Sequence, residues 1–169
     1  TPDSKSVISY NGEIYNFEAL KKHELLKDIS FEGNSDTEVL LQLYHQSHSP
    51  ESFLEKHLNL LNGIFAFAIW DETNQVGMII RDRFGVKPIY FQEINNSVFF
   101  ASEIKAIHKL NRQSAAQERG VEGSKGQNSK QLNPKALDGH LNYLWNPHNF
   151  SMFPGVKKLG PGEWLLFKV

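Results

Sequence analysis

The sequence GIFAFAIWD, residues Gly63–Asp71, is a nearly continuous apolar run with the length of a β-strand. A run without polar alternation is typical of a buried strand. The polar turn DETNQ follows, and QVGMIIRD, residues 75–82, is a second run of strand length. These two runs predict a buried β-hairpin.

Upstream of this hairpin, KSVISY, residues 5–10, predicts a strand rich in Val, Ile and Tyr. The dipeptide Asn11-Gly12 predicts a turn directly after it. Asn16 is a good N-cap for the helix that follows. Three apolar residues share one side of that predicted helix: Phe17, Leu20 and Leu25.

Two more helices are predicted before the hairpin. Ser35 and Glu38 have the S-x-x-E spacing of a capping box, so a helix begins in SDTEVLLQLYHQ. Pro50 opens a shorter helix with the sequence PESFLEKHLNLL.

Downstream of the hairpin, RFGVKP reads as a loop, and PIYFQE and SVFFASE form a second hairpin around INNS. EIKAIHKL is a short helix. Residues 111–131 hold no aromatic residue and only one large aliphatic residue, so we expect a mobile polar loop. Asn133 and Pro134 then start another helix, and a Gly-Pro-Gly turn leads into a last strand.

This order of elements, with helices grouped apart from antiparallel hairpins, predicts a layered α+β domain. We expect residues 1–110 to form its core, 111–131 the mobile loop, and 132–169 a C-terminal helix and strand of the same domain.

Composition excludes several functional classes. The formal net charge is −1, from 18 basic and 19 acidic residues, so nothing favours a nucleic-acid or membrane partner. No cysteine occurs in the 169 residues, which excludes a disulfide or a cysteine nucleophile within them. The seven histidines show no metal-ligand spacing, so we predict no metal site.

Five motifs occur in a characteristic order: YNGEIYN, SDTE, LNGIFAFAIWD, RDRFGVKPIY and FASEIKAI. Together they resemble the class II glutamine amidotransferase domain, and most of all that of the glutamine-hydrolysing asparagine synthetases. The resemblance implies an N-terminal nucleophile hydrolase fold, an αββα sandwich of two antiparallel sheets between helical layers. It also implies hydrolysis of the glutamine side-chain amide by an N-terminal cysteine thiolate.

The same resemblance assigns four candidate site residues. The Asn11 side chain and the Gly12 N–H form the oxyanion hole, where fixed donors stabilise the tetrahedral intermediate. Glu13 contacts the amino-acid end of glutamine, and Asp36 pairs with its α-ammonium group. Each also has a structural reading: a turn for Asn11-Gly12, a solvated charge for Glu13, and a first-turn acid for Asp36. Other motif residues are expected to fix the loop between strands: Arg81, Asp82, Gly85 and Pro88.

This sequence departs from the family pattern at its start, because the nucleophilic cysteine and an arginine for the glutamine carboxylate are not present in it. Three explanations stand open. The sequence is a fragment that lacks the N-terminal cysteine segment; it is a degenerate, non-catalytic scaffold or binding domain of an amide-forming synthetase; or Thr1 is itself the nucleophile. Pro2 and the polar stretch around Thr1 argue against the third.

By resemblance, L-glutamine is the substrate, and a C-terminal synthetase domain of the same parent chain receives the ammonia. That domain would use ATP and Mg, whereas this one needs no cofactor. The resemblance also implies a cytoplasmic protein and is compatible with a homodimer. The acceptor substrate stays open, because its site lies in the synthetase domain.

Overall fold

The computed structural model describes residues 5–94, 96–110, 132–144, 146 and 149–168. The chain divides into two compact units: Thr1–Lys87 with Pro161–Val169, and Pro88–Gly160. The predicted mobile loop, residues 111–131, lies outside the described residues.

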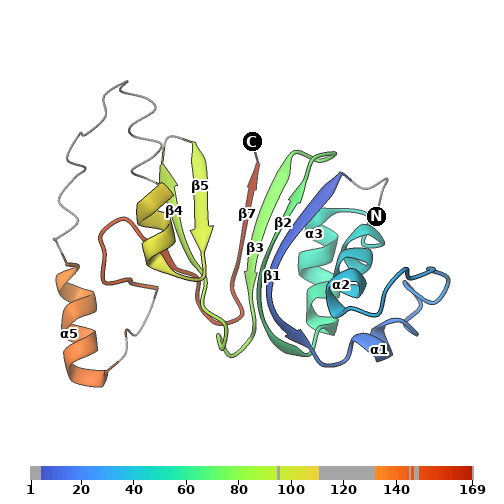
Figure 1. The fold of residues 1–169 in the computed structure, drawn as a ribbon, viewed down its shortest axis with the longest axis horizontal. Coiled ribbons are helices and arrows are strands. Elements are labelled where there is room, and N and C mark those ends of the chain that lie inside the picture. Colours follow the sequence, from blue (N-terminus) through green and yellow to red (C-terminus); the bar gives the residue numbers. More distant parts are fainter. Residues whose placement is uncertain (1–4, 95, 111–131, 145, 147–148, 169) are drawn as a thin grey trace. The chain divides into compact units, whose positions relative to one another are not determined.

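The first unit contains a four-stranded antiparallel sheet with the strand order β1-β2-β3-β7 (Figure 1). Its strands are β1 (Ser6–Ile14), β2 (Gly63–Asp71), β3 (Val76–Arg81) and β7 (Trp164–Lys168). The predicted buried hairpin is β2 and β3, and the predicted last strand is β7, so both predictions are confirmed. β1 forms one edge of this sheet.

β1 does not turn at Asn11-Gly12, so the predicted turn is wrong. The strand continues through both residues and pairs with β2 throughout, with Asn11 opposite Ala66 and Gly12 opposite Phe65. Gly12 has a φ of +153°, and a Cβ added there would lie 2.2 Å from the carbonyl oxygen of Ile64. The close approach of β2, rather than a bend, therefore requires glycine at this position.

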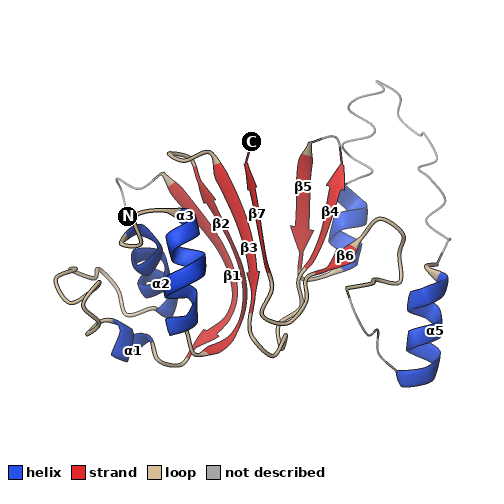
Figure 2. Ribbon diagram, turned by 180° about the vertical axis from the view of Figure 1, so that it is seen from behind, coloured by secondary structure: helices blue, strands red, loops and turns tan. Residues whose placement is uncertain are grey.

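Helical segments cover one face of this sheet (Figure 2). They are α1 (Phe17–Leu20), α2 (Asp36–His45) and α3 (Pro50–Ser52), which continues as a π-helical turn (Phe53–His57) and a 3-10 turn (Leu58–Leu60). The predicted start of α2 is confirmed, since Ser35 Oγ accepts a hydrogen bond from the Glu38 amide. The core between helices and sheet includes the fully buried Leu40, Phe53 and Phe67.

α1 is shorter than the sequence predicts. It ends at Leu20, and Leu25 lies in the turns that follow. The Asn16 side chain does not cap α1; instead it donates to the Leu60 carbonyl and accepts from the Asn62 amide. Asn16 thus ties the end of β1 to the chain entering β2.

The second unit contains a three-stranded antiparallel sheet with the order β5-β4-β6. Its strands are β4 (Tyr90–Ile94), β5 (Ser97–Ala101) and β6 (Lys157–Lys158), and its helices are residues 104–110 and α5 (Pro134–Tyr143). The second hairpin and both helices are confirmed, whereas β6 is not predicted from the sequence. Two antiparallel sheets with helices confirm the α+β class. Within the described part of the chain, no helix is long and apolar enough to cross a membrane.

Candidate functional site

The four candidate residues lie on two elements of the first unit. Asn11, Gly12 and Glu13 are consecutive in β1, and Asp36 is the first residue of α2. The side chains of Asn11 and Glu13 are exposed and share one face of the strand, because side chains alternate between faces. Asp36 is half-buried.

The backbone amide of Gly12 points away from β2, to the side of β1 that no other described strand pairs with. In an antiparallel pair of strands, every second residue exchanges hydrogen bonds with its partner, and the residues between them point their N–H and C=O groups the other way. The Tyr15 amide donates to the carbonyl of Asn62, so the odd-numbered residues of β1 are the ones that bond to β2. The alternation therefore turns the Gly12 N–H away from β2. In agreement, Phe65, which is paired with Gly12, exchanges its hydrogen bonds with Asp82 on the other side of β2.

The carboxylate of Asp36 lies against this same edge. Its Oδ2 accepts hydrogen bonds from the Ile14 amide at 2.9 Å and from the Tyr10 hydroxyl at 2.6 Å. Gly12 and Ile14 are two residues apart in one strand, so their amides point the same way and lie about 7 Å apart. The structure thus brings Asp36 to the strand edge toward which the Gly12 amide points.

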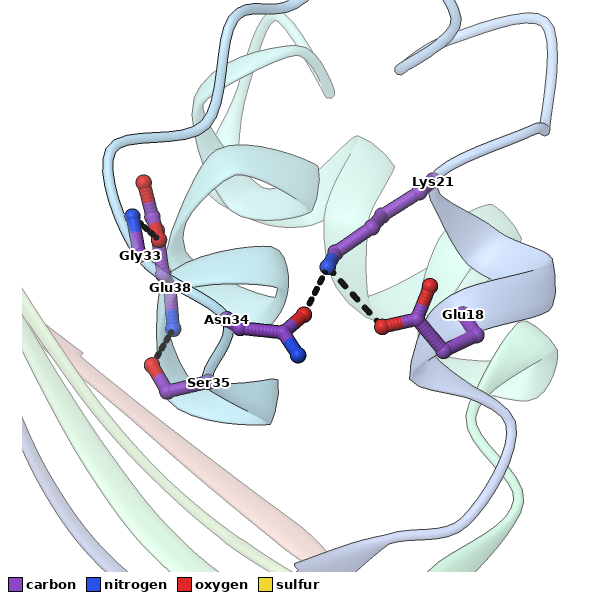
Figure 3. A network of polar contacts seen from close by, with 6 residues as sticks. All are labelled: Glu18, Lys21, Gly33, Asn34, Ser35 and Glu38. Carbon is purple, nitrogen blue, oxygen red and sulfur yellow. Dashed lines mark hydrogen bonds and ion pairs between the residues drawn. The ribbon is translucent and has the colours of Figure 1, made fainter.

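A network of polar contacts holds the loop that precedes α2 (Figure 3). Lys21 Nζ contacts Glu18 Oε1 at 3.0 Å and Asn34 Oδ1 at 2.6 Å, which ties α1 to this loop. Glu38 Oε2 accepts from the Gly33 amide at 2.9 Å, so the Glu38 side chain binds the loop. The network fixes the residues directly before Asp36.

The electrostatic environment keeps Asp36 charged. Burial raises the pKa of its carboxyl, but hydrogen bonds from Tyr10, Ile14 and Thr37 outweigh burial and lower that pKa overall. Burial raises the pKa of Tyr10, and the hydrogen bond and negative charge of Asp36 and the charge of Glu13 raise it further. At neutral pH the strand edge therefore carries a carboxylate held by a neutral phenol.

Sequence reasoning misses Tyr10. The residue ends the apolar run KSVISY, and the pattern assigns it only to a strand. Tyr10 is also the first residue of the motif YNGEIYN, directly before Asn11, and that position is a signal that points to it. Among the described residues, no group of three or more His, Asp or Glu side chains is placed to hold a metal ion.

Comparisons with known proteins identify the family of this chain. The family model described as "Glutamine amidotransferase domain" matches residues 1–169. Asparagine synthetase [glutamine-hydrolyzing] 1 of Bacillus subtilis is 34% identical over 92% of this chain and 21% of its own length. Asparagine synthetase [glutamine-hydrolyzing] 3 of the same organism is 48% identical over 59% of this chain and 15% of its own length. The chain thus spans about a fifth or less of these relatives.

Solved structures agree in fold. The glutamine phosphoribosylpyrophosphate amidotransferase of B. subtilis has a TM-score of 0.56 and 24% identity, over 66% of this chain and 24% of its own chain. An allosteric regulatory enzyme of purine biosynthesis also has a TM-score of 0.56, with 25% identity over 64% of this chain and 23% of its own. These likenesses confirm the predicted N-terminal nucleophile hydrolase type of fold.

Proposed function

The chain belongs to the family of class II glutamine amidotransferase domains, of the type found in glutamine-hydrolysing asparagine synthetases, and on this premise we propose that it is the glutaminase domain of a glutamine-dependent amidotransferase. Such a domain releases ammonia from the side-chain amide of L-glutamine. The observation that carries the proposal is the edge of β1: the amide of Gly12 points to this edge, and the carboxylate of Asp36 is bonded there to the amide of Ile14, two residues further along the strand.

The Gly12 amide and the Asn11 side chain act in the proposal as donors to the oxyanion. Nucleophilic attack on the carboxamide moves negative charge to its oxygen, and each fixed donor aimed at that oxygen can contribute about 3–4 kcal/mol. A backbone N–H and a side-chain amide suit this task because neither needs to be protonated first. The outward direction of the Gly12 N–H supports this role.

Asp36 and Glu13 bind the amino-acid end of glutamine in the same proposal. The lowered pKa of Asp36 supports a permanent negative charge, which suits an α-ammonium group. The amides of Gly12 and Ile14 lie about 7 Å apart along β1, and Asp36 is bonded at the Ile14 end of this spacing. In the proposal, one extended glutamine contacts both ends of the site.

The proposal places the nucleophile outside residues 1–169, because they contain no cysteine. By themselves these residues would bind glutamine without releasing ammonia. A synthetase domain of the same parent chain, with ATP and Mg, would consume the ammonia. Because the relatives are named asparagine synthetases, we propose asparagine formation as the reaction.

Glutamine binding tests the proposal directly. In an NMR titration of residues 1–169 with L-glutamine, we expect the amide signals of Gly12 and Ile14 to shift, even where binding is weak. Asp36→Asn should weaken this binding, whereas Glu24→Gln, which changes an exposed carboxylate, should leave it unchanged. Absence of a shift at millimolar glutamine, or equal binding by both variants, would refute the proposed site.

A further inference from the structure

We infer that Tyr10 is a positioning residue for glutamine recognition: its hydroxyl holds Asp36 so that Oδ1 of the carboxylate is presented to the α-ammonium group. This inference rests on the proposed function and adds a residue that the motif does not assign.

The two oxygens of Asp36 have different surroundings. Oδ2 accepts from the Tyr10 hydroxyl at 2.6 Å and from the Ile14 amide at 2.9 Å, and both donors belong to β1. Oδ1 is contacted by the Thr37 hydroxyl at 3.4 Å, which is long for a hydrogen bond from a hydroxyl. The Thr37 amide also hydrogen-bonds to this carboxylate. Both donors from β1 are on Oδ2, so a ligand cation would meet the carboxylate at Oδ1, where the Thr37 hydroxyl contact is long.

Neutral groups hold this carboxylate. A lysine or arginine in the place of Tyr10 would compensate the charge of Asp36, whereas a phenol and a backbone amide leave that charge available to a ligand. No salt bridge between described residues involves Asp36. The arrangement therefore orients a carboxylate without neutralising it, as recognition of an ammonium group requires.

Tyr10 is itself held in place. Its ring packs against the ring of buried Phe67, with centroids 6.5 Å apart and planes at 51°. The start of α2 is fixed independently by the contacts of Lys21 and Glu38 with the preceding loop. Contacts on β1 and at the start of α2 therefore both resist movement of Asp36. A carboxylate that is already held in its binding position loses less entropy when a ligand binds.

A purely structural tie between β1 and α2 would have the same geometry, so the test must separate the two roles. Binding of L-glutamine and of glutaramate, the analogue without the α-amino group, is measured by NMR titration of residues 1–169. Tyr10→Phe should weaken L-glutamine binding about tenfold, the effect of one hydrogen bond to a charged group, and should leave glutaramate binding unchanged. Tyr15→Phe, at an exposed tyrosine of the same segment, is the matched control.

A double variant makes the test independent of folding losses. If Tyr10 acts through Asp36, Tyr10→Phe should have no further effect on L-glutamine binding in an Asp36→Asn background. An equal loss for both ligands, or the same loss in both backgrounds, would overturn the positioning role while leaving the glutamine site intact. No binding of L-glutamine by the unaltered chain would overturn the proposed function, and this inference with it.

Discussion

The hydroxyl of Tyr44 in α2 donates a 2.5 Å hydrogen bond to Oδ2 of Asp71, the last residue of β2. Both side chains are buried, at 4% and 5% exposure, and Asp71 also accepts from the amide and the side chain of Asn74. The helix that begins with Asp36 is therefore bonded to β1 at its first residue and to the end of β2 near its last turn.

Removing the Tyr44 hydroxyl should destabilise the fold. Tyr44→Phe leaves the buried Asp71 carboxylate with fewer donors, and we expect the free energy of unfolding to fall by about 1–3 kcal/mol. Urea denaturation measures this change. Tyr15→Phe, at a side chain that is 56% exposed, should alter stability by less than about 0.5 kcal/mol. Similar losses for the two variants would contradict the role of the Tyr44–Asp71 bond.

Stability should depend on acid pH through Asp36 and Asp71. Burial raises each pKa, but hydrogen bonds, from Tyr10 to Asp36 and from Tyr44 to Asp71, outweigh burial and lower it in the folded state. A carboxyl with a lowered folded pKa contributes stability above its unfolded pKa of about 3.9, and that contribution is lost as the pH falls through the folded value.

We therefore expect the free energy of unfolding to decrease below about pH 4. The decrease should be smaller in Tyr44→Phe, because that variant has already lost part of the Asp71 contribution. Urea denaturation across a series of pH values measures both profiles. Parallel profiles, offset by a constant, would show that the Tyr44 bond does not favour the charged form of Asp71.

Asp82 should be needed for the loop between β3 and β4. Its side chain is fully buried; Oδ1 accepts from the amides of Phe84 and Val86, and Oδ2 accepts from the amide of Lys87. Arg81 and Gly85 also hold this loop, as the motif predicts, since the guanidinium donates to the Gly85 carbonyl.

Asp82→Ala removes these acceptors together, and we expect a loss of about 3 kcal/mol or more in unfolding free energy. Amide hydrogen exchange should accelerate at residues 84–87 before the rest of the unit. Asp82→Asn keeps one acceptor oxygen and should lose less, while Asp28→Ala, at an exposed aspartate, serves as the control. Unchanged exchange in this loop would contradict the prediction.

The sequence predicts most elements because their signals are local. The apolar runs of β2 and β3, the Ser35 cap of α2 and the Asn133 cap of α5 are each contained in a few neighbouring residues. The Asn11-Gly12 dipeptide also has a local preference, for a turn, and there the prediction is wrong. Nine consecutive residue pairs with β2 outweigh that preference, and the register is a long-range property.

The candidate site likewise has some features with local sequence signals and others that depend on long-range contacts. The motif order identifies Asn11, Gly12, Glu13 and Asp36 as candidates, but it does not reveal which backbone groups point outward. The direction of the Gly12 amide depends on the register between β1 and β2, and the contact between Tyr10 and Asp36 joins residues 26 positions apart. Neither feature has a signal within a short window of sequence.

The last prediction concerns catalysis, in a protein that joins this chain to the cysteine-bearing segment that the proposed function requires. Asn11→Ala removes a donor to the oxyanion but little of the ground-state binding, so kcat for ammonia release should fall about a hundredfold with KM changed much less. Asp36→Asn keeps the shape of the side chain but removes the charge that meets the α-ammonium group. It should mainly raise KM for glutamine and weaken discrimination against glutaramate. Steady-state kinetics with both substrates, alongside urea denaturation of each variant, separates the two signatures from loss of folding. Equal and mild changes in both constants at both positions, with a matching loss of stability, would mean that Asn11 and Asp36 serve the strand and the helix start alone.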